Sequence, residues 1–325
     1  MRLLLVINAS ASAVTPRTRV VIAQALAAGH RTEVVETDRR GHATELASDA
    51  AAAGWDAVVV LGGDGTLNEA ANGVAGTGTA LAVLPGGSTN VFARTIGTAP
   101  EPVEATGQLL AALDAGSRRR IGLGFADDRH FLFHLGIGFD AAVIHRVERR
   151  GHLKRYVSHP LFLAATVDTW LRHYDRSRPR FAIKIGEPML GDPAHPPQGR
   201  PARGDVPDAL EDGRFAVFLN SDPYTYLGRR PLHLAPGRGL GSELGVVAFR
   251  SLRLRDLLGV AGRALGSGQR VASHPAVWSA TEVTDATVEG FGPFPFQVDG
   301  DYLGETTSLR VGFRPGVLDL IVPAL

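Results

Sequence analysis

Hydrophobic positions in the first 140 residues form short apolar runs that alternate with longer segments of helical periodicity. A strand buried on both faces is apolar throughout, whereas an amphipathic helix repeats its apolar positions about every 3.6 residues. The expected strands are 3–7, 32–35, 57–61 and 80–84, and the expected helices are 16–29, 41–53, 67–74 and 102–115. Repeated strand–helix units predict a Rossmann-like parallel sheet with helices on both faces.

The pattern changes beyond this region, where short apolar segments are separated by turn residues. Such spacing predicts an antiparallel β-sandwich. The expected strands are 181–185, 214–220, 245–249, 286–289, 296–299, 308–313 and 317–322. A helix is expected over 160–174, and the proline-rich segment 187–213 is expected to be a loop. We therefore expect an α/β domain over 1–140 and a β-sandwich domain over 141–325, whose final strands return toward the first domain.

Residues 58–69 read Val-Val-Val-Leu-Gly-Gly-Asp-Gly-Thr-Leu-Asn-Glu and join an apolar strand to a helix through a glycine-rich turn. Gly62, Gly63 and Gly65 allow positive φ and close approach of a ligand to the backbone, and a helix N-terminus attracts anions. The turn thus predicts a phosphate site. Asp64 within it implies either an accompanying cation or a role in proton transfer. The alternative is an ordinary tight turn, for which Gly and Asp are also common.

Two other phosphate-binding loops do not fit this segment. No Gly-Lys-Ser/Thr follows the glycines, as a Walker loop requires, and the Gly-x-Gly-x-x-Gly spacing of the dinucleotide fingerprint is absent.

A second tract, at 84–94, reads Leu-Pro-Gly-Gly-Ser-Thr-Asn-Val-Phe-Ala-Arg. Together with the tract at 62–69 it resembles the diacylglycerol kinase catalytic domain, a family that includes bacterial lipid kinases and the sphingosine and ceramide kinases. Their usual second tract is Leu-Pro-x-Gly-Thr-x-Asn-Asp-Phe-Ala-Arg, so Ser88 keeps the hydroxyl and Val91 loses a carboxylate. NAD kinases and phosphofructokinases share Gly-Gly-Asp-Gly, which makes the pair of tracts more specific than either one.

The resemblance implies a phosphofructokinase- and NAD-kinase-like nucleotide domain that binds ATP with Mg²⁺. The implied nucleotide contacts are Asn8, Thr37, Gly62, Gly63, Asp64, Gly65, Thr66, Asn68, Glu69, Gly87 and Ser88, with Asp64 also the implied Mg²⁺ ligand and a catalytic residue. The first loop departs from the family, because Asn8-Ala9-Ser10 lacks its usual Pro and Gly. Arg94 is a candidate for stabilising transition-state charge, with a surface cation as the equal alternative.

Two tracts of the second domain carry further implications. Asp299-Gly300-Asp301 lies where the lipid kinases have Asp-Gly-Glu, so the resemblance implies Asp301 as the catalytic base, one methylene shorter than the family's Glu; taken alone, the tract predicts a hairpin turn. The family's Ala-Pro tract holds a structural Mg²⁺ through a following Asp-Gly. Residues 234–244 lack that Asp-Gly, and Glu243 is a weak substitute, so we do not expect this metal.

Composition limits the remaining choices. The chain has 325 residues, a net charge of +1 and no cysteine, which disfavours a nucleic-acid binder and excludes disulfides and thiolate chemistry. The apolar run after Met1 is too short for a signal or membrane span, so we expect a cytoplasmic protein. The lipid substrate that the resemblance implies adds transient contact at the membrane surface. The basic run at 145–155 fits a solvated helix end better than a lipid-headgroup site. A homodimer is left open.

The activity that the resemblance implies is transfer of the γ-phosphoryl group of ATP to a membrane lipid hydroxyl, with diacylglycerol as the expected acceptor and phosphatidic acid, a phospholipid precursor, as the expected product. Two alternatives remain. An NAD-kinase-like enzyme shares the Gly-Gly-Asp-Gly turn, and a non-catalytic lipid-binding protein on the same fold would explain the departures at Val91, Asp301 and the Asn8 loop.

Overall fold

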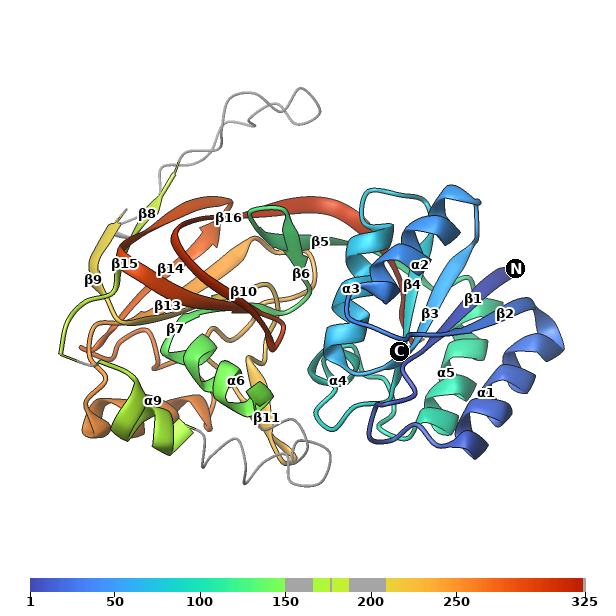
Figure 1. Cartoon of the computed structure of the whole chain (residues 1–325), viewed down its shortest axis with the longest axis horizontal. Coiled ribbons are helices and arrows are strands. Elements are labelled where there is room, and N and C mark those ends of the chain that lie inside the picture. Colours follow the sequence, from blue (N-terminus) through green and yellow to red (C-terminus); the bar gives the residue numbers. More distant parts are fainter. Residues whose placement is uncertain (150–165, 176, 187–208, 324–325) are drawn as a thin grey trace. The chain divides into compact units, whose positions relative to one another are not determined.

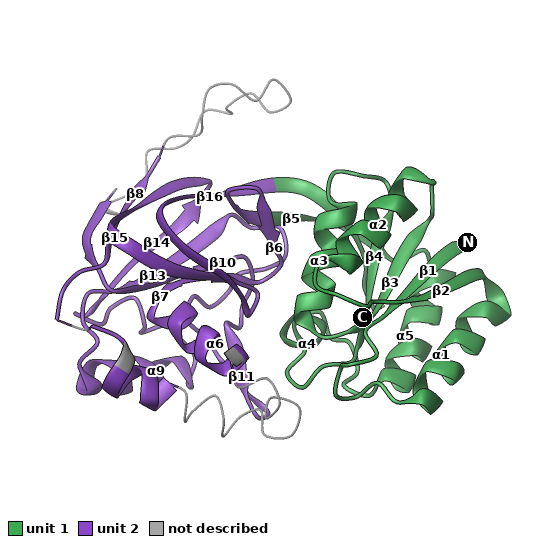
Figure 2. Cartoon of the chain, viewed as in Figure 1, with its two compact units in different colours: residues 1–123, 315–325 green, residues 124–314 purple. Residues whose placement is uncertain are grey.

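The computed structural model describes residues 1–149, 166–175, 177–186 and 209–323. The chain forms two compact units (Figure 2): unit 1 comprises Met1–Leu123 and Pro315–Leu325, and unit 2 comprises Gly124–Arg314. The division expected at residue 140 lies later in the chain than this one, since residues 124–140 make their contacts within unit 2. No helix in the described ranges is long and apolar enough to cross a membrane.

Unit 1 contains a parallel sheet with strand order β2–β1–β3–β4, extended on the β4 side by the end of β16. Its strands are β1 (Arg2–Ile7), β2 (Arg31–Glu36), β3 (Ala57–Gly62), β4 (Ala80–Pro85) and the last residues of β16 (Asp301–Ile321). Its helices are α1 (Pro16–Gly29), α2 (His42–Ala52), α3 (Asp64–Val74), α4 (Val91–Thr95) and α5 (Pro102–Asp114). Helices α1 and α5 cover one face and α2 and α3 the other (Figure 1). The expected α/β fold is confirmed.

Burial along the strands explains why the apolar runs located this sheet. Every residue of β3 and β4 is buried, as expected for central strands covered on both faces. Strand β2 lies at the edge and exposes Val34, so its apolar run is the shortest. Helix α1 begins at the Thr15 cap, whose side chain accepts a hydrogen bond from the Thr18 amide.

Unit 1 depends on close contact between two glycine pairs that follow β3 and β4. A Cβ atom on Gly86 would lie 2.9 Å from the Cα atom of Gly62, and one on Gly87 would lie 2.9 Å from the Cα atom of Gly63. A Cβ atom on Gly63 would meet nothing nearer than the Cα atom of Gly87 at 3.6 Å. Gly63 has φ −89°, and Gly65 lies inside α3. Gly86 and Gly87 are therefore needed for close backbone contact, and the expectation that Gly62, Gly63 and Gly65 serve positive φ is wrong, because none of the three adopts it.

Unit 2 is the expected antiparallel β-sandwich. Its strands, besides the parts of β5 (Arg118–Ala126) and β16 that it contains, are β6 (Arg129–Phe131), β7 (His134–Gly138), β8 (Phe181–Ile185), β9 (Ala209–Gly213), β10 (Phe215–Leu219), β13 (Leu244–Phe249), β14 (Val277–Val283) and β15 (Asp285–Val298). A separate hairpin pairs β11 (Thr225–Leu227) with β12 (Arg230–Leu232). The helical segments are α6 (Phe139–Arg149), the π-helical turn η1 (Thr169–His173) and α9 (Leu254–Ala264).

Alternating side chains of β10 show how the layers of unit 2 pack. Ala216 and Phe218 face the core shared with β8, β15 and β16. Val217 and Leu219 face a second cluster that includes residues of α6 and α9. Because successive residues of a strand point to opposite faces, one strand serves both layers.

Several elements differ from the sequence expectation. The segments expected at 286–289 and 296–299 are one strand, β15, and those at 308–313 and 317–322 belong to β16. The end of the expected loop, Ala209–Gly213, is strand β9 and pairs with β8, while 187–208 lies outside the described residues. Only the final part of the helix expected over 160–174 and the first part of the basic run at 145–155 are described.

The tight turn between β15 and β16 is held by a buried carboxylate. Val298 pairs with Asp301, and the two residues between them, Asp299 and Gly300, have φ values of 49° and 83°, as a type I′ turn requires. The Asp299 side chain accepts hydrogen bonds from the backbone amides of Leu132 (2.7 Å), Phe133 (3.0 Å) and His134 (3.0 Å). The predicted hairpin turn is therefore present, and Asp299 fixes it to the start of β7.

We expect Asp299→Ala to lower the free energy of unfolding by about 3 kcal/mol or more, because three buried amides lose their acceptor. Asp301→Asn is the matched control, since Asp301 is only partly buried on the same turn. Urea unfolding of both variants gives the comparison. Equal stability of Asp299→Ala and the wild type would contradict the anchoring role.

We expect Gly87→Ala to destabilise the protein by about 1–3 kcal/mol, because its new methyl group overlaps the backbone at Gly63. The same change at Gly63 finds ordinary contact distances and should leave the melting temperature close to that of the wild type. Thermal unfolding of the two variants side by side distinguishes close backbone packing from a general intolerance of alanine in these turns.

Candidate functional site

Three loops of unit 1 meet at the carboxyl edge of its parallel sheet, where ligands of such sheets bind. They follow β1, β3 and β4. Hydrogen bonds join them directly: the Gly86 amide donates to the Gly62 carbonyl (2.7 Å), and the Ala13 amide donates to the Gly86 carbonyl (2.8 Å). The two sequence tracts at 62–69 and 84–94 are thus brought together, as their pairing in the sequence suggested.

Asp64 links these two tracts through its carboxylate. It is the first residue of α3, and its oxygens accept hydrogen bonds from the amides of Val91 (2.9 Å) and Phe92 (3.2 Å) at the start of α4. Burial raises the pKa of the Asp64 carboxyl to about 6, while the two amides and the charge of Arg94 act in the opposite direction. Asp64 is therefore first of all a positioning residue for the second tract.

Asn8 and Thr66 form a second link at this edge. The Asn8 amide nitrogen donates to the Thr66 hydroxyl (2.9 Å), and its amide oxygen accepts from the Ser10 backbone (3.0 Å). The Asn8 side chain thus shapes the loop after β1 and holds the first turn of α3. Its effect on a ligand would pass through Thr66.

Glu69 and Asn68 lie deeper than their assignment as nucleotide contacts implies. The Glu69 carboxylate accepts from the amides of Gly41 (2.9 Å) and Ala43 (3.2 Å) and so caps the N-terminus of α2. Asn68 is fully buried and accepts through its side-chain oxygen from Asn72 (3.2 Å). Both side chains support the framework of the site.

Thr37 and Ser88 remain closer to the surface. The Thr37 amide donates to the Ile7 carbonyl (2.8 Å), which places the partly exposed Thr37 directly beyond β2. Ser88 is exposed in the turn between Gly87 and Asn90. The Asn90 side chain closes that turn by accepting from the Gly87 amide (2.9 Å) and donating to the Gly87 carbonyl (2.8 Å).

The N-terminus of α3 carries the capacity to bind an anion. No side chain in the described part of the chain caps it, and the first intrahelical bond runs from the Leu67 amide to the Gly63 carbonyl (3.1 Å). The amides of Asp64, Gly65 and Thr66 therefore have no acceptor within the helix. Together with the helix dipole they favour a phosphate group at this position.

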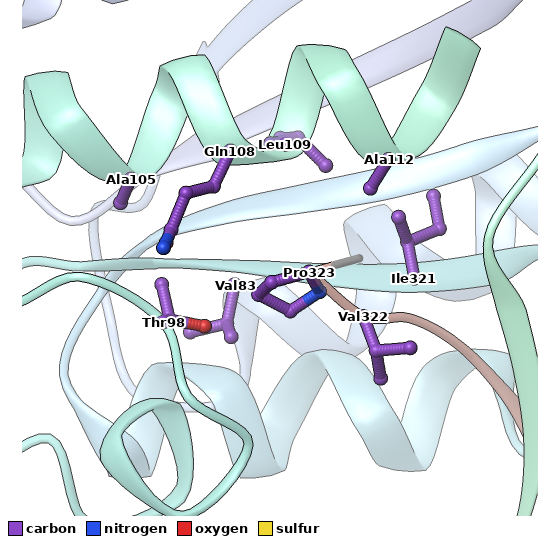
Figure 3. Close-up of a pocket in the computed structure, with 9 residues that line it drawn as sticks. All are labelled: Val83, Thr98, Ala105, Gln108, Leu109, Ala112, Ile321, Val322 and Pro323. Atoms are coloured by element: carbon purple, nitrogen blue, oxygen red, sulfur yellow. The ribbon is translucent and has the colours of Figure 1, made fainter. Parts of the chain in front are cut away.

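A separate small pocket lies between α5 and residues 321–323 (Figure 3). It is lined mainly by apolar side chains, including Val83, Leu109 and Ile321, with Thr98 and Gln108 as polar members. None of the residues expected to contact the nucleotide lines it. The candidate phosphate site at the loops is therefore separate from this pocket.

Asp301, the expected base, is the first residue of β16 in unit 2 and is partly exposed. Gln297 connects the turn that precedes Asp301 to Asp140. The Gln297 side-chain oxygen accepts from the Gly300 amide (2.7 Å), and the side-chain nitrogen donates to the Asp140 carboxylate (2.6 Å). Asp140 also accepts from the Tyr224 hydroxyl (2.5 Å). A buried polar network thus lies beneath the turn.

Burial sets the protonation of this network. It lowers the pKa of His134 to about 3, so the imidazole is neutral at physiological pH, and it raises the pKa of Asp140. The His134 Nε2 atom lies 4.0 Å from Asp140, and its Nδ1 atom has no hydrogen-bond partner among the described residues. Asp140 and Gln297 were missed in the sequence, although each is a polar residue within or next to an apolar strand.

The described residues contain no cluster of three or more His, Cys, Asp or Glu side chains that could enclose a metal ion. In the tract at 234–244, the Arg238 guanidinium donates to the Glu243 carbonyl. Asp64 could also contribute to a phosphate-bound Mg²⁺, because a carboxylate has about four lone-pair directions and the amides of Val91 and Phe92 occupy two of them.

Comparison with known proteins agrees with the two tracts and the fold. A family model of the diacylglycerol kinase catalytic domain matches residues 2–123. Over 308 residues the chain is 30% identical to a Pseudomonas aeruginosa protein named "Probable lipid kinase YegS-like", covering 94% of this chain and 89% of that protein. A protein of the same name from Chromohalobacter salexigens is 37% identical over 136 residues, which are 41% of this chain and 42% of that protein.

One further relative is similar to this chain in sequence, and two solved structures are similar to it in fold. A Bacillus subtilis diacylglycerol kinase is 36% identical over 116 residues, 34% of this chain and 36% of that enzyme. The crystal structure of a Bacillus anthracis diacylglycerol kinase has a TM-score of 0.67 at 19% identity and covers 99% of this chain and 96% of that one. An Archaeoglobus fulgidus NAD kinase solved with ATP has a TM-score of 0.50 at 11% identity, covering 99% and 94%, and shares the fold alone. The chain belongs to the diacylglycerol kinase-like family of lipid kinases.

Proposed function

We propose that this protein transfers the γ-phosphoryl group of ATP to the hydroxyl of diacylglycerol. The observation that carries the proposal is the bond between the family's two sequence tracts: the Asp64 carboxylate holds the amides of Val91 and Phe92 beside an uncapped helix N-terminus. That arrangement combines a phosphate site with a fixed second loop. Membership of the lipid kinase family supports a lipid as the acceptor.

The nucleotide roles follow from the contacts in unit 1. We assign the phosphates to the amides of residues 64–66 and to the exposed Ser88 hydroxyl. Asn8 positions Thr66, and Glu69 positions the loop before α2. Mg²⁺, when bound with ATP near Asp64, would neutralise phosphate charge. Arg94 lies close enough to lower the Asp64 pKa, so its charge acts on this loop.

We assign the base to Asp301. Its carboxylate would take the proton of the lipid hydroxyl as that oxygen bonds to the γ-phosphorus and the bond from phosphorus to the β–γ bridging oxygen breaks, leaving ADP. The anchored turn supports this role, because Asp299 and Gln297 fix the backbone on which Asp301 sits. A carboxylate shorter than the family's Glu needs such a fixed position.

The deciding experiment is incubation of the protein with radiolabelled ATP and separate acceptors: diacylglycerol, ceramide, a sphingoid base, phosphatidylglycerol and NAD. We expect label in phosphatidic acid, identified by mass. Label in NADP instead would establish the NAD-kinase-like alternative. Lipid binding without any ATP turnover would establish the non-catalytic one.

Asp64 provides a test with a pH signature. Its folded-state pKa of about 6 exceeds the ordinary value of 3.8, so it holds a proton below pH 6 and caps α4 less well. We expect turnover and ATP protection against unfolding to rise as pH increases through about 6.

The contribution of Asp64 to the free energy of unfolding changes in the opposite direction. It is largest below pH 4 and declines toward pH 6, because the folded state binds the proton more tightly than the unfolded state does.

Asp64→Asn should remove that inflection in both measurements. Turnover at pH 7.5 should fall about 10²-fold, because an amide nitrogen facing a backbone amide displaces the second tract. An unchanged pH profile of ATP protection in this variant would show that Asp64 is not the titrating group.

Asp301 is tested by two substitutions. Asp301→Asn should lower kcat and kcat/KM together with ATP affinity unchanged, as expected for a group that acts in the transition state. Asp301→Glu should retain activity, because it restores the family's residue at the same turn. Full specific activity in a stable Asp301→Asn protein would remove Asp301 from the mechanism.

A further inference from the structure

One surface of unit 2 exposes large apolar side chains from two segments. Helix α9 exposes Leu254 (53%) and Leu258 (63%), and Leu265 follows its end at 39%. Val167, just before η1, is 55% exposed, and Leu171, within η1, is 56% exposed. We call these five residues the α9 surface; Figure 1 marks the helix.

The two segments of the α9 surface lie together. The Trp170 indole nitrogen donates to the Leu252 carbonyl (2.9 Å), just before α9, and Trp170 and Leu257 pack against the same buried cluster. Val167 and Leu171 are four residues apart, as are Leu254 and Leu258, so each pair shares a side of its segment. The two segments that carry the exposed side chains are therefore held together by the same buried cluster.

The exposed leucines are not needed for the core of unit 2. Val260 and Ala264 already occupy the buried side of α9. Because residues of a helix advance by about 100°, Leu254, Leu258 and Leu265 lie on one side and Val260 and Ala264 on another. A second apolar side, left open to solvent, indicates a surface that is covered in some bound state.

Charge around the α9 surface is arranged for an anionic partner. The side chains of Arg172 and Arg255 are 76% and 75% exposed, and Arg253 and Arg270 are also exposed. Two neighbouring acids are less exposed and have several partners each. Asp168 is 19% exposed and pairs with Arg146 (2.7 Å) and Arg172 (3.8 Å), while Asp256, 17% exposed, pairs with Arg255 (3.5 Å) and accepts from Ser251 (2.6 Å). Asp175, just after η1, is exposed, but the arginines outnumber the acids, so the net charge of these residues is positive.

We propose that the α9 surface docks on a membrane that contains anionic phospholipids. Its leucines and valine enter the headgroup region, and its arginines contact lipid phosphates. This inference rests on the proposed function in so far as a lipid acceptor requires contact with a bilayer. A second copy of the chain fits less well, because a two-fold contact would place these arginines against one another.

The test uses sedimentation with vesicles of phosphatidylglycerol and phosphatidylcholine, or of phosphatidylcholine alone, without ATP. We expect the wild type to bind the anionic vesicles more tightly. The double variant Leu254→Ser and Leu258→Ser should bind them at least about tenfold more weakly. Arg253→Ser and Arg255→Ser should each weaken binding to the anionic vesicles about fivefold and leave binding to phosphatidylcholine vesicles unchanged.

Val20→Ser is the matched control, since Val20 is equally exposed (55%) on α1 of unit 1. It should bind like the wild type. Unchanged binding by the leucine and arginine variants would overturn the docking surface, as would a wild-type dimer that the leucine variant converts to a monomer in light scattering. The surface arginines keep the test decisive if the leucine variant fails to fold.

Kinase assays separate this inference from the proposed function. With a short-chain, water-soluble diacylglycerol, the variants and the wild type should be equally active, whereas on vesicles the variants should be slower. Vesicle binding that depends on the α9 surface, in a protein that phosphorylates no lipid, would contradict the proposed function alone. Equal activity of all variants on vesicles would contradict the docking surface alone.

Discussion

The hydrogen bonds from two amides to the Asp64 carboxylate are the interaction on which the candidate site depends. They connect the start of α3 to the start of α4, two elements that the chain places almost thirty residues apart. α4 is only a short helix and could not hold its position through its own hydrogen bonds. The glycine pairs after β3 and β4 make the same connection possible, because any side chain on Gly86 or Gly87 would separate the two loops.

In unit 2, as in unit 1, a buried carboxylate accepts hydrogen bonds from backbone amides and joins two segments. Asp299 is almost completely buried and accepts hydrogen bonds from three consecutive amides, so a single carboxylate fixes both a hairpin turn and the beginning of β7. A buried charge is costly unless it is fully hydrogen-bonded, and here the amides meet that condition. In Asp299-Gly300-Asp301 the first acid holds the turn, and the second lies partly exposed at its edge.

The sequence predicted unit 1 well because its central strands are buried on both faces and therefore stand out as apolar runs. It predicted the proximity of the two tracts for the same reason, since parallel strands end at one edge. It could not show that Glu69 caps α2 or that Asn8 acts through Thr66, because those partners are far apart in the chain. Unit 2 was less predictable. Strand β15 continues through a glycine- and proline-rich stretch, where its pairing with β16 shifts in register, and Gln297 has no local signal for its contact with Asp140.

The end of β16 affects the order in which the chain can fold. Leu320 pairs with Leu81 of β4, and the Gly76 amide donates to the Val317 carbonyl (2.7 Å), so the sheet of unit 1 is completed by residues that follow all of unit 2. During synthesis on the ribosome, the first 123 residues emerge without this strand and leave one side of β4 unpaired. The sandwich, in contrast, can close before the chain returns. During cotranslational folding, the order of completion should therefore differ from the order of synthesis: unit 2 is completed first and unit 1 last.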